Sequence, residues 1–187
     1  MARTSMAWLL ARLRRMVNDG DSAVWTDAEL QQVADYHRIH IRREFLEYDV
    51  DQQSYFSKFG NLEGTYITDQ EANAVWDNDA TIIKMWDSNS SSATAITPIY
   101  WNLADGSFGF TSDQDDEYYL DAKSYDLHGA AAELFEELSA DSSRAYRWVR
   151  GSVSHTAESF LDLAKYHRSL SGPQSLEVRR TYRTEVA

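Results

Sequence analysis

The fold class follows from residues 124–135, which read Ser124-Tyr125-Asp126-Leu127-His128-Gly129-Ala130-Ala131-Ala132-Glu133-Leu134-Phe135. We expect a strand to end at Tyr125 and a helix to follow, because the Asp126 carboxylate can accept hydrogen bonds from the free N–H groups of a first helical turn. The small residues Gly129, Ala130, Ala131 and Ala132 would let another backbone come close. The pattern predicts a tightly packed helix of the kind that subunits of an oligomer use for contact.

Four helices are predicted in all. The first lies within residues 1–18, where Met6, Leu9, Leu10, Leu13, Met16 and Val17 recur at helical spacing. The second begins at a capping box, Thr26 to Glu29, and runs to about Tyr48. The third runs from Asp126 to Ala140, with an extension to Tyr146 left open, and the fourth runs from about Ser154 to the stop at Gly172-Pro173.

Between the second and third helices the pattern changes to aromatic and β-branched runs separated by Gly, Asn, Asp and Ser clusters. The best local signal is Asp105-Gly106, since glycine supplies the positive φ of a tight hairpin. The polar segment 87–93 is expected to be a mobile loop. Candidate strands are Tyr55–Phe59, Thr65–Thr68, Thr81–Trp86, Ile99–Leu103, Ser107–Thr111 and Tyr118–Asp121.

These patterns predict an α+β fold, in which a bundle of about four helices carries an inserted antiparallel β module within one domain. The segments are N-terminal helices at 1–48, the β module at 49–123, a C-terminal helix pair at 124–172 and a tail at 173–187. With 43% apolar residues in 187, a substantial core is expected. No run approaches the roughly 20 apolar residues that span a bilayer, so we expect a soluble chain.

Charge is distributed unevenly along the chain, whose net charge is −12. Residues 1–18 contain four arginines and no acid, residues 144–187 contain eight bases and four acids, and the middle carries a net −20. Ends and body of opposite sign suggest contacts between copies or with a partner, although solubility alone is the other explanation. The acidic body argues against a surface that grips nucleic acid.

No catalytic, cofactor-binding or metal site is predicted, so we do not expect an enzyme. The segment Gly151-Ser152-Val153-Ser154-His155 lacks the last glycine of a nucleophile elbow, and Ser154 is better explained as a helix cap. There is no cysteine for a disulfide or a thiolate zinc site. Glycine-rich phosphate loops are absent as well.

Three possible ion sites are each better explained without a bound ion. His37, His40 and Glu44 are spaced to share one side of a helix, but no second ligand cluster accompanies them. The acidic run 113–117 has Tyr118 where a calcium loop needs glycine, and pairs such as Asp77 and Asp79 are expected by chance in so acidic a chain.

The order of helices and motifs resembles the head–tail adaptor, or connector, proteins of tailed bacteriophages. The likeness covers residues 5–48 and 124–183 and rests on short motifs and their order. They are Leu9-Leu10-Ala11-Arg12-Leu13-Arg14-Arg15-Met16-Val17-Asn18-Asp19, Trp25-Thr26-Asp27-Ala28-Glu29-Leu30, Tyr125-Asp126-Leu127-His128-Gly129-Ala130-Ala131, Gly151 and Tyr166-His167-Arg168.

The resemblance implies a structural role in the virion neck, after synthesis in the host cytoplasm. Such a protein forms a ring, usually of twelve subunits, beneath the portal of the DNA-filled head, and the tail or a further neck ring attaches to it. Packaged DNA passes through the channel without sequence-specific binding, and no membrane or cofactor is involved.

A C-terminal extension reaches the portal in this family, which here places Arg179, Arg180, Tyr182 and Arg183 at the portal. Sibling copies would pack against Gly129–Ala132, and the hairpin tip at Asp105 and Gly106 is a candidate contact with neighbours. The long β insert departs from the simplest adaptors. Two alternatives stay open: another neck, head-completion or tail-completion ring, and a small metal-dependent hydrolase or nuclease using the acidic loops and His37 or His40.

Overall fold

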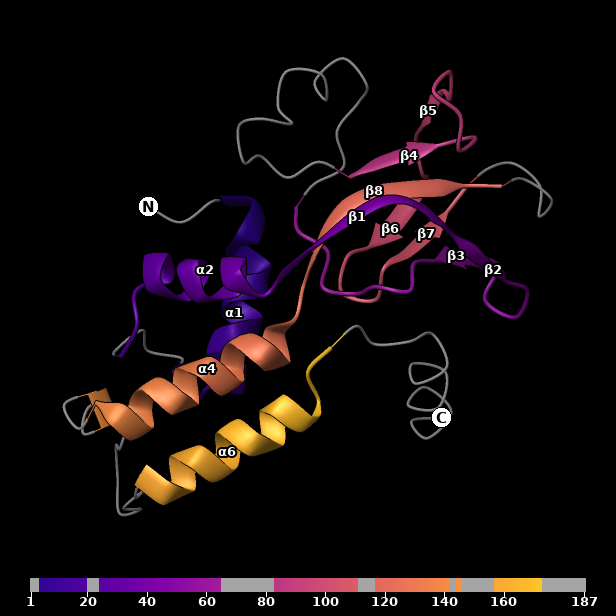
Figure 1. Ribbon diagram of the computed structural model, residues 1–187. Coiled ribbons are helices and arrows are strands. Elements are labelled where there is room, and N and C mark those ends of the chain that lie inside the picture. The colour runs from indigo at the N-terminus through magenta and orange to yellow at the C-terminus, as the bar shows by residue number, and fades with distance from the viewer. Residues whose placement is uncertain are drawn as a thin grey trace. The chain divides into compact units, whose positions relative to one another are not determined.

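The structure, a computed structural model, describes residues 4–19, 24–64, 83–110, 117–141, 144–145 and 157–172 (Figure 1). It contains both helices and antiparallel sheets, so the predicted α+β class is confirmed. The chain divides into two compact units. The helical unit is formed by residues up to Arg38 together with Asp126–Gly172, and the β unit is formed by Ile39–Tyr125.

The helical unit contains helices from both ends of the chain. A 3-10 turn at Thr4–Met6 leads into α1 (Ala7–Met16), which is followed by α2 (Asp27–Tyr36), α4 (Leu127–Ala140) and α6 (Ala157–Ser169). Most of the predicted apolar positions are buried, because each helix packs its apolar stripe against neighbouring helices. Leu161, on the predicted apolar face of α6, is an exception and is 41% exposed. Buried side chains include Met6, Leu9, Leu13, Leu30, Val33, Leu127, Leu134, Phe135, Leu138 and Phe160.

Local capping signals act as predicted. The Thr26 hydroxyl accepts a hydrogen bond from the Glu29 N–H at 3.3 Å, and Glu29 Oε2 accepts one from the Thr26 N–H at 2.8 Å. Asp126 caps α4, since its Oδ1 accepts a hydrogen bond from the Gly129 N–H at 2.9 Å. Both helices therefore start where their sequences place them.

The second helix ends much earlier than predicted. It stops at Tyr36, and residues Arg38–Phe45 form strand β1 instead of three further helical turns. Arg43 has a φ of +49°, which a right-handed helix cannot contain, and its N–H donates to Asp121 Oδ1 at 2.6 Å. The spacing that suggested a helix is thus overridden by pairing with a strand far along the chain, β8.

Among the residues that the structure describes, the β unit forms two four-stranded sheets, with strand orders β1-β8-β4-β5 and β2-β3-β7-β6. Strand β4 pairs antiparallel with β5 and β8, while β3 pairs antiparallel with β2 and β7, and β7 with β6. The remaining bounds are β2 Glu47–Asp49, β3 Ser54–Phe56, β4 Lys84–Trp86, β5 Ala95–Ile96, β6 Tyr100–Asn102, β7 Ser107–Gly109 and β8 Tyr119–Tyr125.

Side chains of both sheets form one apolar core. Met85 and Leu120 come from one sheet, and Tyr55 and Phe108 from the other. Five of the six predicted strands match an observed strand at least in part, and the sixth, Thr65–Thr68, lies outside the described residues. The sequence did not predict β1, β2 or β5. Segment 87–93 connects β4 to β5, and the Asp87 carboxylate accepts a hydrogen bond from the Thr94 N–H at 2.9 Å.

The predicted hairpin at Asp105-Gly106 joins β6 to β7, and Gly106 has the expected positive φ, +68°. Its tip is packed against its own chain. A Cβ on Gly106 would lie 2.2 Å from the Phe59 carbonyl oxygen, and the Gly106 carbonyl accepts a hydrogen bond from the Ser57 N–H. Because Gly106 is buried, any contact with another chain at this tip would fall to the half-buried Asp105.

Candidate functional site

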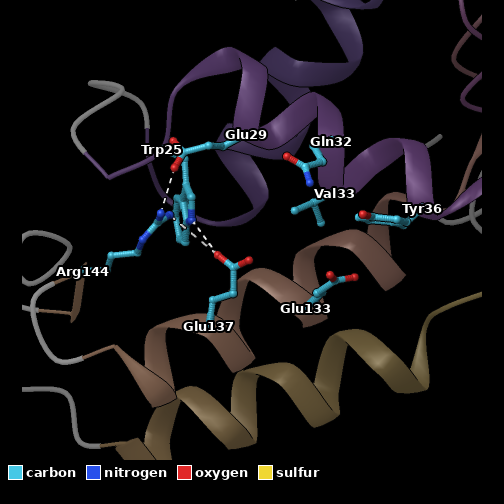
Figure 2. Close-up of a pocket in the computed structure, with 8 residues that line it drawn as sticks. All are labelled: Trp25, Glu29, Gln32, Val33, Tyr36, Glu133, Glu137 and Arg144. Carbon is cyan, nitrogen blue, oxygen red and sulfur yellow. Dashed lines mark hydrogen bonds and ion pairs between the residues drawn. The ribbon is translucent and has the colours of Figure 1, made fainter.

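A pocket of about 200 Å³ opens in the helical unit between α2 and α4 (Figure 2). Positions Glu29, Gln32, Val33 and Tyr36 follow helical spacing on α2, and Glu133 and Glu137 are one turn apart on α4. The pocket therefore combines an aromatic and aliphatic wall with a carboxylate rim. Its lining residues are Trp25, Glu29, Gln32, Val33, Tyr36, Glu133, Glu137 and Arg144.

One end of the pocket is an ion-pair network around Arg144. Its Nη2 lies 2.8 Å from Glu29 Oε1 and its Nη1 lies 3.7 Å from Glu137 Oε2. The Trp25 indole N–H donates to the same Glu137 oxygen at 3.2 Å, and Figure 2 shows these side chains pointing toward one another. Hydrogen bonds from the Thr26 backbone and hydroxyl, followed by Arg144, lower the pKa of Glu29.

His37, the C-cap residue of α2, lies beside Glu133, which lines the pocket. Its Nε2 lies 2.9 Å from Glu133 Oε2. A Cβ at position 129 would come within 2.7 Å of His37 Nδ1 and 2.8 Å of Asp126 Oδ2, so Gly129 is required for this close approach. The glycine thus has a structural explanation inside the chain.

The chemistry of the pocket favours a cationic group over an anionic one. Three carboxylates and a single guanidinium line the pocket, and aromatic faces such as that of Trp25 attract cations. Arg144 already provides such a cation from the same chain, so the network also joins the start of α2 to the end of α4.

A second polar cluster lies where α4 begins and α6 ends. The Nδ1 atoms of His128 and His167 are 3.0 Å apart, and the His167 ring stacks on Phe135 with centroids 5.5 Å apart. Burial lowers the pKa of both imidazoles. Two imidazoles are too few for a metal centre by themselves. Among the described residues, no group of three or more His, Asp or Glu side chains could hold a metal ion.

The structure separates the residues whose spacing suggested a metal site on one side of a helix. His37 ends α2, whereas His40 and Glu44 lie in β1, and Glu44 instead accepts hydrogen bonds from the Ser57 hydroxyl and the Lys58 N–H. Several other candidates fall outside the described residues: Asp77, Asp79, Asp113–Asp116, Gly151–His155 and the tail residues Arg179, Arg180, Tyr182 and Arg183.

The small-residue run of α4 is covered by its own chain. Gly129, Ala130, Ala131 and Ala132 are all buried, and the three alanines have no exposed surface. Close packing was predicted correctly, but the packing observed is within the chain. Contact between copies stays a prediction, and in this conformation it would have to use exposed neighbours rather than these side chains.

The sequence alone does not predict the pocket or the contact between His128 and His167. Helical spacing could have placed Glu133 and Glu137 on one side of a helix, and Glu29 and Val33 on one side of another. It gives no signal that these two faces meet.

No protein-family model matches this chain, and neither a curated protein nor a solved structure is significantly similar to it. Within the described ranges, no helix has the length and apolar character required to cross a membrane.

Proposed function

We propose that this chain is a head–tail adaptor of a tailed bacteriophage, which forms a ring beneath the portal and links the DNA-filled head to the tail or to the next neck ring. The observation that carries the proposal is the order of its parts. Helices from both ends of the chain form one unit, and the β unit is inserted between them, between Arg38 and Asp126. This order matches the helix, β segment and helix arrangement on which the resemblance rests.

The motifs that carry the resemblance support the proposal through their positions. The motif Leu9–Asp19 covers most of α1, the motif Trp25–Leu30 begins α2, and the motif Tyr125–Ala131 begins α4. In the proposed role these helices, with α6, form the bundle from which the ring is assembled. At this end of the chain the correspondence is limited to α1 and α2, because residues 38–45 form strand β1 and not the helix that was part of the likeness over residues 5–48.

Charge supports assembly between copies. Residues 1–18 carry four arginines and no acid, whereas the middle of the chain, residues 19–143, carries a net charge of −20. In a ring each subunit meets its neighbour through two different surfaces, so complementary charges favour closure. An acidic channel wall would let DNA pass without binding tightly, because it releases no phosphate counterions.

Co-expression with the portal protein encoded in the same genome tests the proposal. We expect native mass spectrometry and electron microscopy to find rings of this chain, usually with twelve copies, either free or only on the portal. A chain that stays monomeric and does not bind the portal would refute the proposal. Turnover of a substrate that chelator abolishes would instead favour the hydrolase alternative.

The tail contact has its own test. Replacing Arg179, Arg180 and Arg183 together by glutamate should abolish co-sedimentation with the portal, because it reverses three charges at the proposed contact. The matched control replaces the same three residues by lysine, which keeps the charge. If the glutamate variant binds as well as the lysine variant, the tail does not make this contact.

A further inference from the structure

Helix α6 runs antiparallel alongside α4, so the end of α6 lies at the start of α4 (Figure 1). Two kinds of contact hold these ends together. The Asp126 carboxylate accepts hydrogen bonds from the Gly172 N–H at 2.9 Å and from the Ser171 hydroxyl. One turn inward, His128 of α4 meets His167 of α6.

The contact between the two histidines requires a neutral ring. With Nδ1 atoms 3.0 Å apart, one ring must donate its N–H and the other must accept with a lone pair. A second proton would leave two donors facing each other and two positive charges in contact. The pair therefore tolerates at most one charge in the docked arrangement.

Neighbouring groups do not remove this restriction. Around His128, the Asp126 carboxylate favours the protonated ring while the Arg12 guanidinium of α1 disfavours it. His167 is stacked on Phe135, has its neighbour Tyr166 edge-on, and is disfavoured as a cation by His128. Asp126 already accepts hydrogen bonds from Gly129, Ser171 and Gly172, so its charge is shared among several donors.

We propose that His128 and His167 form a pH-dependent latch, which holds the end of α6 on α4 while at least one ring is neutral and releases it when both rings are protonated. Release exposes the face of Phe135 that His167 now covers. The contact of the earlier turns of α6 is apolar, through the buried Phe160 and Ala164, so the movement is confined to the last turns of the helix.

The direction of the pH effect follows from burial. Burial lowers the pKa of both rings below the ordinary value of 6.5, so the released state binds protons more readily than the docked state. Docking is therefore fully stable above about pH 6.5 and weakens as the pH falls toward the lowered values. For each unit by which one pKa is lowered, protonation favours release about tenfold.

Carboxylate titration can be separated from this effect. The exposed ion pair between Arg168 and Glu136, 2.6 Å apart, also holds α6 to α4. A comparison of about pH 7.5 with pH 5 stays above the range near pH 4.3 in which free carboxylates ordinarily titrate. A change of α6 docking within that interval therefore reports the histidines.

The test is hydrogen exchange of the full chain, measured by mass spectrometry at about pH 7.5 and pH 5 and corrected for intrinsic exchange rates. We expect protection of 163–169 to fall about tenfold or more at the lower pH, while α1 and α2 keep theirs. In His167→Phe, which keeps an aromatic ring against Phe135, protection should depend much less on pH, because two imidazoles no longer face each other and only His128 is left to titrate. His40→Gln, altered in β1, should behave like the wild type.

Equal protection of 163–169 at both pH values in the wild type would overturn the latch, as would an unchanged loss in His167→Phe. Should that variant fail to fold, histidine ring titrations followed by NMR in the unaltered protein decide the matter. Two rings that titrate below pH 6.5, together with α6 resonances at the same midpoint, support the latch. Rings that titrate at the ordinary value, or α6 resonances that do not change, refute it.

Discussion

Replacing Asp19 by alanine should strongly destabilise the helical unit. The Asp19 carboxylate lies between α1 and α2 with only 2% of its side chain exposed, and its Oδ2 is 2.8 Å from Arg14 Nη1. It also accepts hydrogen bonds from the Val24 N–H at 3.1 Å and the Trp25 N–H at 3.2 Å. One side chain thus satisfies three donors in a buried position.

The expected cost follows from what alanine leaves behind. Breaking a buried ion pair by removing one partner costs about 3–5 kcal/mol, because the other charge stays buried, and Asp27, the carboxylate that Arg14 keeps, is largely exposed. Two backbone N–H groups also lose their acceptor, at about 1–3 kcal/mol each if water cannot reach them. These effects overlap, so we expect a total of about 3–5 kcal/mol, a large part of the stability of an ordinary domain.

Urea unfolding followed by far-ultraviolet circular dichroism measures this loss. Asp27→Ala is the matched control, because Asp27 binds the same arginine with its Oδ1 2.7 Å from Arg14 Nη2 but has 62% of its side chain exposed. An exposed pair of this kind is worth about 1 kcal/mol or less. A double change, Arg14→Met with Asp19→Ala, should recover part of the loss because no charge is left buried.

The reasoning would be refuted if Asp19→Ala were no more destabilising than Asp27→Ala. A second refuting result would be a double variant, Arg14→Met with Asp19→Ala, that is less stable than Asp19→Ala alone by about 3–5 kcal/mol more. The loss of stability would then come from lost packing rather than from a buried charge without its partner.

Two further substitutions test the packing. Gly106→Ala should destabilise the β unit by about 1–3 kcal/mol, because φ is positive there and a Cβ would clash with the Phe59 carbonyl; a β-unit transition unchanged in thermal unfolding would contradict this. Ala131→Leu should destabilise the helical unit by about 1–3 kcal/mol in the same urea assay, because Ala131 has no exposed surface and a larger side chain would not fit. The control is Ala140→Leu at the exposed end of α4, which should change the free energy of unfolding little. Equal effects of the two leucines would show that α4 is not tightly packed at Ala131.

Local sequence signals were sufficient to predict where α2 and α4 begin. The hydrogen bonds of Thr26 with Glu29 and of Asp126 with Gly129 involve residues three apart, so the sequence alone carries them. Gly106 was predicted for a similar reason, because a positive φ is a property of a single residue.

Long-range pairing was beyond sequence reasoning. Residues 38–45 satisfy a helical pattern, and only the presence of β8 decides that they form a strand. The pocket likewise joins residues that the β insert separates along the chain, such as Glu29 with Glu137, and the histidine pair joins two helices through residues 39 positions apart. Spacing predicts which side chains share a face of one helix, and it cannot predict which faces meet.

The position of the insert has an evolutionary consequence. The chain leaves the helical unit after Arg38 and returns at Asp126, and these two points are joined by a hydrogen bond of 3.0 Å from the Asp126 N–H to the His37 carbonyl. An inserted segment whose two ends lie next to each other can become longer or shorter, or be replaced, without changing the path of the flanking helices. Natural selection can therefore vary residues 39–125 for new attachments while the helical unit keeps one architecture.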